Sequence, residues 1–277
     1  MTTASFHALR FGRAAARYES RARVQARMAQ VLLDLWGDRP APAHILEFGC
    51  GTGLLTRALR ARFPGAAGTS KTTLTATDAS PQMWELAQES LKDDGQHPVS
   101  FLTQNARGDE LPKPALMRSA AKQPYDLLAA GALVQWFPDL AAHFRFAALL
   151  AAPGARYLVS GFDAANFPEI NALLREPPFE YRSFPGHTQN EIEKAAVEAG
   201  WTVTTFLGWE ESEVLPTPRS VLQLLQELGS VRDPREGGRM NRANLAHLLS
   251  EYERLYSCEG GVRLTWKPWA ALLTRAS

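Results

Sequence analysis

The chain has few of the features that mark secreted, membrane-spanning or metal-binding proteins. Cysteine occurs twice in 277 residues, at Cys50 and Cys258, so neither a disulfide framework nor a paired-cysteine metal motif is present. No apolar run approaches the ~18 residues that a membrane span needs. The formal net charge is +1, which favours neither nucleic acid nor a membrane as a partner. We expect a metal-free protein of a reducing cytoplasm.

The N-terminal segment is rich in arginine and carries one nearby acid, Glu19. Such a start is also typical of organelle transit peptides. Apolar residues, however, recur at helical spacing and run without a break toward the first expected strand. We therefore expect residues 1–36 to form a helical segment of the folded domain. The arginines are Arg10, Arg13, Arg17, Arg21, Arg23 and Arg27, and the apolar positions are Val24, Met28, Val31, Leu32 and Leu35.

Short apolar runs then alternate with helical patterns, which predicts a Rossmann-like α/β fold with a mostly parallel seven-stranded sheet and helices on both faces. The expected strands are His44–Phe48, Thr73–Thr77, Val99–Thr103, Tyr125–Ala130, Arg156–Phe162, Trp201–Leu207 and Arg263–Leu273. The expected helices are Leu54–Phe63, one capped by Ser80, Leu140–Leu150, Glu191–Ala199 behind a Thr188 capping box, Thr217–Gly229 and Asn241–Tyr256. Residues 106–124 lack clear periodicity, so we expect a long loop there.

We expect residues 1–277 to form a single domain. Two helices stand between the last two expected strands, which is more than a minimal sheet needs. This predicts a helical insertion over residues 208–260 that could cover a site together with residues 1–36.

A glycine-rich turn follows the first expected strand and carries the strongest chemical signal. It contains Glu47, Gly49, Gly51 and Gly53, and Asp78 ends the next strand. Glycines let a ligand lie against the backbone, and an acid after the second strand suits two ribose hydroxyls. The alternative is that the glycines serve only helix packing and that Asp78 is only a helix cap.

The spacing of these glycines separates two classes of cofactor. Dinucleotide oxidoreductases need a further glycine where this chain has Leu54. A turn led by an acid suits a ligand that has no phosphate and carries a positive sulfonium, such as S-adenosylmethionine. The pattern resembles motif I of class I methyltransferases. Cys50 within it is more typical of a packed small residue than of a nucleophile.

Further cofactor contacts are expected just beyond the second and third strands. We assign Ala79 and Met83 to the same site as Asp78. Gln104 and Asn105 end the third strand, and Asn105 can both donate to and accept from the edge of an adenine. Its alternative role is a loop amide that caps a turn, and Asp109 is a weaker candidate.

Several segments resemble one family, the malonyl-[acyl-carrier protein] O-methyltransferases of biotin synthesis. These segments span nearly the whole chain. The first two are Phe11-Gly-Arg-Ala-Ala-Ala-Arg-Tyr18-Glu with Gln25, and Leu133-Val-Gln135-Trp136-Phe-Pro-Asp-Leu140. The other two are Ser220-Val-Leu-Gln-Leu-Leu-Gln-Glu-Leu-Gly229 and Leu264-Thr-Trp266. The chain departs from the family in its longer 65–72 and 106–124 connections, and in Asn105 where the family usually has aspartate.

The resemblance implies methyl transfer to the free carboxylate of a malonyl thioester on acyl-carrier protein, or on coenzyme A. It implies Tyr18 as a residue that covers the donor and contacts the cofactor, with Gln135 and Trp136 in the transfer pocket; Tyr18 and Trp136 could equally be core residues. A carboxylate favours an arginine, and we select Arg182 as the candidate; its alternative is an ordinary surface role. Arg10, Arg13, Arg17, Arg21 and Arg23 could dock an acidic carrier or be a solvated face. A methyltransferase for another small acid and a non-catalytic cofactor-binding partner remain alternatives.

Overall fold

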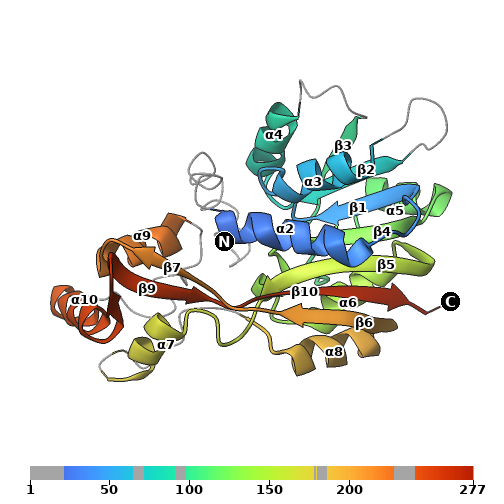
Figure 1. The fold of residues 1–277 in the computed structure, drawn as a ribbon. Helices are drawn as coiled ribbons and strands as arrows, with labels where there is room; N and C mark the ends of the chain where they lie inside the picture. The colour runs from blue at the N-terminus through green and yellow to red at the C-terminus, as the bar shows by residue number, and fades with distance from the viewer. Residues whose placement is uncertain are drawn as a thin grey trace.

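A computed structural model describes residues 22–64, 72–91, 98–177, 179, 186–227 and 241–276, and its centre is a seven-stranded sheet (Figure 1). The strand order is β3-β2-β1-β4-β5-β10-β6. The first five strands in that order pair in parallel, and β10 is antiparallel to both of its neighbours. The bounds are β1 (His44–Phe48), β2 (Thr73–Asp78), β3 (Val99–Thr103), β4 (Tyr125–Ala130), β5 (Ala151–Phe162), β6 (Trp201–Gly208) and β10 (Pro268–Arg275). The predicted Rossmann-like, mostly parallel sheet is confirmed.

Helices bury both faces of this sheet. On one face, α2 (Arg23–Trp36) crosses β5 and β10 and packs on α3 (Leu54–Arg62), with Leu32 and Leu59 fully buried. On the other face, α6 (Leu140–Ala148) and α8 (Gln189–Glu198) cover a core that contains Tyr157 and Trp201. Each buried side chain of this size contributes roughly 1.5–3 kcal/mol. The carboxyl ends of the parallel strands are thereby held in fixed register at one edge, which we call the carboxyl edge.

An insertion between β6 and β10 builds a second, smaller sheet of order β7-β9-β8. Its elements are β7 (Glu211–Leu215), α9 (Pro218–Glu227), α10 (Arg242–Tyr256), β8 (Ser257–Cys258) and β9 (Gly261–Trp266). A further helix, α7 (Pro168–Arg175), follows β5 and packs on α10 and β9. Figure 1 places the insertion beyond the carboxyl edge. The predicted insertion is confirmed in position, but its description as helical was incomplete.

The expected last strand, Arg263–Leu273, is two strands in two sheets. β9 pairs with β7 in the small sheet, and β10 pairs with β5 and β6 in the large one, with Lys267 between them. Trp266 is buried in the insertion and Trp269 in the main core. Both halves are rich in apolar residues and only Lys267 separates them, so the sequence hides the change of sheet.

The expectation of a long loop over residues 106–124 was wrong in part. Residues Pro114–Lys122 form α5, with proline in the first turn. Leu116 and Ala120, four positions apart, are its buried side chains, and both join the main core. Two buried apolar residues in a helix of nine residues give too weak a periodicity to predict the helix from the sequence.

The predicted helix-start signals had different outcomes. Thr188 and Glu191 form the expected capping box at α8. Ser80 does not cap α4 (Pro81–Ser90) with its side chain, since its hydroxyl donates to Gln82 Oε1. Across the described ranges, no helix combines the length and the apolar character of a bilayer span.

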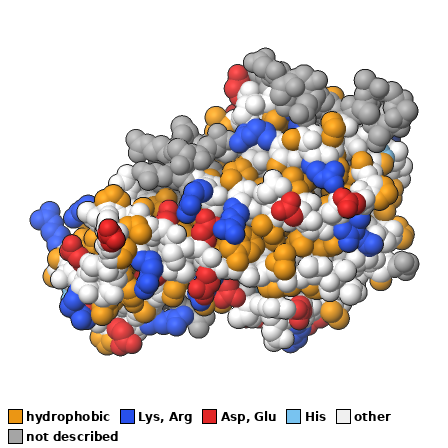
Figure 2. Space-filling model, viewed as in Figure 1, with side chains coloured by type: hydrophobic (Ala, Val, Ile, Leu, Met, Phe, Trp, Pro, Cys, Tyr) orange, Lys and Arg blue, Asp and Glu red, His pale blue; other side chains and the backbone are white. Residues whose placement is uncertain are grey.

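The start of α2 is tied to the insertion through Glu211. Arg23 and Arg27 lie 3.2 and 3.1 Å from the two carboxylate oxygens of Glu211, and Arg27 also lies over the Trp209 ring. Of the five arginines expected to form a basic docking face, only Arg23 is described, and its charge is partly balanced here. The face shown in Figure 2 carries basic and acidic side chains interspersed.

A buried histidine fixes the loop after β3. His143 in α6 is fully buried, with Nδ1 2.5 Å from the Ala106 carbonyl oxygen and Nε2 2.6 Å from the Tyr157 hydroxyl. Its imidazole therefore donates to Ala106 and accepts from Tyr157. Burial lowers the pKa of His143 to about 4, so the ring is neutral near pH 7.

We predict a pH-dependent loss of stability that originates at His143. Its pKa is lower in the folded state than the usual value of 6.5, so protonation favours unfolding. The contribution of His143 to the free energy of unfolding should fall as pH decreases from 6.5 toward 4, by up to about 3 kcal/mol. Urea unfolding of the wild type and of His143→Gln at several pH values measures this fall as the difference between the two proteins, because the other groups titrate in both. Equal pH slopes in both proteins would contradict the assignment.

Candidate functional site

The glycine-rich turn between β1 and α3 is tightly folded. Gly49, Gly51 and Gly53 all have positive φ, at 65°, 54° and 90°, a region that other residues adopt at a cost. The turn is closed by hydrogen bonds from Cys50 N–H to the Thr77 carbonyl and from Gly53 N–H to the Cys50 carbonyl, both 2.9 Å. The predicted glycines therefore form one compact turn at the carboxyl edge.

Asp78 at the end of β2 faces this turn. Its Oδ2 accepts from Gly51 N–H at 3.0 Å, and its Oδ1 accepts from Ser80 N–H at 2.8 Å. Each oxygen keeps further acceptor capacity, because an ionised carboxylate can accept about four hydrogen bonds. Burial raises the pKa of Asp78, and backbone donors from Ser80, Gly51 and Ala79 oppose that shift. Asp78 thus orders the turn and can still accept from a ligand hydroxyl.

Glu47 lies beneath the turn, 1% exposed. Its Oε2 accepts from the Thr56 hydroxyl of α3 at 2.7 Å. Burial raises the pKa of Glu47 to about 8; the Thr56 hydrogen bond opposes the shift and the nearby Asp78 adds to it. A positive ligand group nearby would relieve this cost by favouring the ionised carboxylate. Two acids therefore lie beside one glycine turn.

Cys50 is a packing residue. Its side chain is buried, and burial raises the pKa of its thiol well above the usual value. A thiol held protonated is a poor nucleophile. This agrees with the structural role expected from the sequence.

The residues expected to flank the cofactor lie around the same turn. Met83 in α4 is buried, with its methyl carbon 3.7 Å from the position that a Cβ on Gly51 would take. Ala79 is exposed beside Asp78. Asn105 is half-buried after β3; it accepts from Arg107 N–H at 3.1 Å and reaches Asp109 at 3.4 Å. Asn105 therefore caps a turn here, which was its alternative role.

Gln104, the other candidate after β3, is held at both ends of its side chain. Its amide donates to the Asn105 carbonyl at 2.8 Å and its carbonyl oxygen accepts from Lys113 N–H at 2.7 Å. Buried and occupied in this way, Gln104 shapes the loop and leaves Asn105 as the more accessible amide.

The segment after β4 contacts the glycine turn through a residue that the sequence did not single out. The Leu133 side chain lies where a Cβ on Gly49 would be, with its Cδ1 2.6 Å from that position. Gln135 and Trp136 follow in a short 3₁₀ helix, η1 (Val134–Trp136). Gln135 is buried and Trp136 is half-buried against the main core. The segment after β4 and the glycine-rich turn thus touch directly.

Two predicted site residues, Tyr18 and Arg182, lie outside the described residues. The structure does not test their assignments. Their roles remain predictions, from the family resemblance for Tyr18 and from carboxylate chemistry for Arg182.

Several of the buried polar atoms that lack a hydrogen-bond partner among the described residues lie in segments at the carboxyl edge. Buried unpaired polar atoms each cost roughly 1–3 kcal/mol, and in native proteins such groups are uncommon. They include Thr52 Oγ1 in the glycine turn, Gln135 Oε1 after β4, Asn166 Nδ2 after β5, Trp209 Nε1 after β6 and Trp269 Nε1 at the start of β10. Thr52 is therefore a further candidate for the cofactor site, since its hydroxyl belongs to the turn itself.

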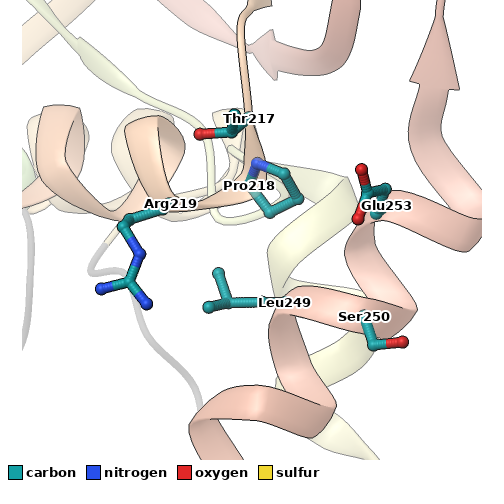
Figure 3. Close-up of a pocket in the computed structure, with 6 residues that line it drawn as sticks. All are labelled: Thr217, Pro218, Arg219, Leu249, Ser250 and Glu253. Atoms are coloured by element: carbon teal, nitrogen blue, oxygen red, sulfur yellow. The ribbon is translucent and has the colours of Figure 1, made fainter.

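A separate surface pocket of about 420 Å³ lies in the insertion. Its lining residues come from the start of α9 and the middle of α10, and Leu249 projects from α10 toward Arg219 (Figure 3). None of the predicted site residues lines it, so we do not assign it to the candidate site. Within the described ranges, no group of three potential metal ligands is present.

Comparisons with known proteins agree with this geometry. A family profile described as a methyltransferase domain matches residues 46–157. The YcgJ protein of Bacillus subtilis superimposes with a TM-score of 0.59 at 14% identity, over 91% of this chain and 99% of that chain. A candidate methyltransferase of Bacillus halodurans gives 0.59 at 12% identity, over 90% and 99%. The fold is therefore that of the class I methyltransferases.

Curated relatives resemble the chain over most of its length. Proteins named malonyl-[acyl-carrier protein] O-methyltransferase from Acetivibrio thermocellus and Chlorobium phaeovibrioides are 27% and 29% identical. The alignments cover 93% and 96% of this chain and 89% and 94% of those proteins. The biotin biosynthesis bifunctional protein BioCD of Bordetella avium is 33% identical over 91% of this chain and 49% of its own length.

The cofactor is S-adenosylmethionine, and the residues of the site fit it. Asp78 offers a carboxylate to hydroxyls, the three glycines form a tight turn at positive φ, and Glu47 offers a buried acid to a positive group. The unpartnered Thr52 hydroxyl adds a polar contact within the turn. All four features come from the adjacent ends of β1 and β2.

We predict that Gly49→Ala weakens cofactor binding through Leu133. The new Cβ would overlap with the Leu133 side chain and adopt a positive φ. Gly154→Ala is the matched control, because Gly154 has a φ of 72° with nothing within 4 Å. In both variants backbone strain should lower the free energy of unfolding by about 1 kcal/mol. Only G49A should also bind S-adenosylmethionine more weakly, by about tenfold, or roughly 1.4 kcal/mol. Calorimetric titration measures the affinity, and equal affinities in the two variants would contradict the packing argument.

Proposed function

We propose that this S-adenosylmethionine-dependent methyltransferase esterifies the free carboxylate of a malonyl thioester carried on acyl-carrier protein, an early step of biotin synthesis. The observation that carries the proposal is end-to-end similarity to proteins of that name, at 27–29% identity over more than nine-tenths of this chain. The Gln135-Trp136 segment and the N-terminal segment with Tyr18 add to it.

On the donor side, we propose that Glu47, Gly49, Gly51, Gly53, Asp78, Ala79, Met83 and Asn105 bind the cofactor. Asp78 would accept from the ribose hydroxyls while it keeps its bond to Gly51 N–H. Glu47 would face positive charge, and Asn105 would turn its amide to the adenine edge. When bound, the cofactor supplies a methyl group made electrophilic by the positive sulfonium.

On the acceptor side, the reaction requires the acceptor carboxylate to be positioned and does not require a base to deprotonate it. A malonyl carboxylate is already ionised at neutral pH. The enzyme has to align it with the methyl group and exclude water, and alignment of two bound reactants contributes ~7–11 kcal/mol. We propose that the half-buried Trp136 walls the transfer pocket, with Gln135 beside it.

We further propose that Arg182 pairs with the malonyl carboxylate and that Tyr18 covers the donor. In this proposal residues 1–277 act as a single domain, with residues 1–36 and 208–260 around the site. Glu211, which joins Arg23 and Arg27 to the insertion, links these two segments. An acidic carrier protein, or coenzyme A in its place, would present the malonyl group.

The proposal is tested with labelled S-adenosylmethionine and four acceptors: malonyl-carrier protein, malonyl-coenzyme A, free malonate and acetyl-carrier protein. We expect methyl ester on the malonyl thioesters and none on the acetyl control, which lacks the free carboxylate. Asp78→Ala should lose transfer together with cofactor affinity, because both the ribose contact and the Gly51 tie are removed.

Two other outcomes would each replace the proposal. Transfer to free malonate or to another small acid alone would indicate a small-molecule methyltransferase. Cofactor binding with no transfer to any malonyl species would contradict the biotin-pathway proposal and would favour the partner-protein alternative.

A further inference from the structure

The turn between β4 and α6, residues 131–137, has a strained backbone that other residues hold in place. Ala132 has a φ of 50°, in the left-handed region, which a residue with a side chain adopts at a cost of roughly 1 kcal/mol or more. The next residue, Leu133, packs on Gly49, and Trp136 lies three residues further on. We call residues 131–137 the acceptor-side turn.

The inner side of the acceptor-side turn is held by Ser160 and Gln135. Ala132 N–H donates to Ser160 Oγ at 3.2 Å, and Gln135 Nε2 donates to the Ala132 carbonyl at 2.7 Å. The Gln135 oxygen lies 3.3 Å from the position that a Cβ on Gly161 would take. The Gln135 amide is therefore directed into the protein and acts on the backbone of the turn.

The outer side of the same turn is held by His187, a residue that no sequence motif marks. Its Nε2 lies 3.0 Å from the Phe137 carbonyl oxygen, so the ring donates to the last residue of the turn. The backbone N–H of His187 donates to the Phe162 carbonyl at the end of β5, at 3.3 Å. Gly186 before it lies so close to the Asp163 carbonyl that any Cβ would overlap with it.

His187 thus joins the loops that follow β4 and β5. The capping box that starts at Thr188 anchors it from the other side, through α8. Burial lowers the pKa of His187, while the Phe137 carbonyl and the Glu191 carboxylate oppose that shift. The ring is neutral near pH 7 and carries its proton on the nitrogen that faces Phe137.

We propose that His187 is a positioning residue that fixes the acceptor-side turn, and through it Trp136, for methyl transfer. The inference rests on the proposed placement of the acceptor beside Trp136. His187 touches neither reactant in this account, because its hydrogen bonds are to the backbone of Val134, Phe137 and Phe162. Its loss should impair the acceptor step and leave donor binding unchanged.

The experiment compares His187→Phe, His187→Gln and the control His44→Phe in the full chain. H187F keeps a ring and removes the donor, whereas H187Q keeps an N–H at similar reach. His44 contacts Thr73 at the opposite edge of the sheet, so H44F makes the same substitution far from the turn. Amide hydrogen exchange over residues 133–140 comes first, because it needs no acceptor.

Loss of one neutral hydrogen bond corresponds to about fivefold faster exchange at Trp136 and Phe137 in H187F. H187Q and H44F should match the wild type. With malonyl-carrier protein, kcat of H187F should fall by a similar factor while the dissociation constant of S-adenosylmethionine stays constant. If H187F does not fold, His187→Ala is measured in its place.

Unchanged exchange in H187F would overturn the proposal. So would a parallel loss of cofactor affinity and turnover, which would indicate a general structural role, or a failure of H187Q to restore either readout. If the wild type methylates no malonyl species, the proposed function fails, and hydrogen exchange still decides whether His187 holds the turn.

Discussion

The hydrogen bond from Gly51 N–H to Asp78 Oδ2 joins the ends of β1 and β2 at the candidate site. In the glycine turn every second residue, Gly49, Gly51 and Gly53, has a positive φ. Glycine is flexible, so a contact from outside the turn is needed to hold the backbone in one conformation. Asp78 supplies it and keeps acceptor capacity for a ligand. Leu133 then packs on Gly49 from the neighbouring strand end, so the geometry of the donor side extends into the acceptor-side turn.

Placing two carboxyl groups, those of Glu47 and Asp78, beside the glycine turn costs free energy, because both are partly or fully removed from water. Buried Glu47 and half-buried Asp78 lie near one turn, and desolvation raises the pKa of each. For Glu47, the folded state favours the protonated acid up to about pH 8, so stability contributed by that proton is lost as pH rises from 4.5 toward 8. The contribution of His143 to stability has the opposite pH dependence. Its pKa is lowered in the folded state, so stability is lost as pH falls. A protein retains such a buried acid at a cost, and a positive ligand beside Glu47 would offset it.

Local patterns in the sequence predicted the parts of the fold and site that depend on neighbouring residues. The glycine turn, Asp78 at the end of β2 and the Thr188 capping box are set within a few residues, and the structure has all three. The division of 263–273 between two sheets depends on distant partners, and so does α5, whose two anchors pack on the main core. His187 was not predicted for the same reason: its partner carbonyl lies 50 residues earlier. Asn105 showed chemistry suited to adenine, but its turn-capping contacts could only be seen in three dimensions.

The central claim is that buried Glu47 and half-buried Asp78 form a site prepared for a positively charged cofactor, and proton release on binding tests it most directly. At pH 7 the free protein holds Glu47 mostly protonated, because its pKa is about 8. Titration calorimetry with S-adenosylmethionine, in buffers of different ionisation enthalpy, measures the protons released. The account predicts release of about one proton in the wild type and close to none in Glu47→Gln. Binding without proton release in the wild type, or equal release in the variant, would contradict it.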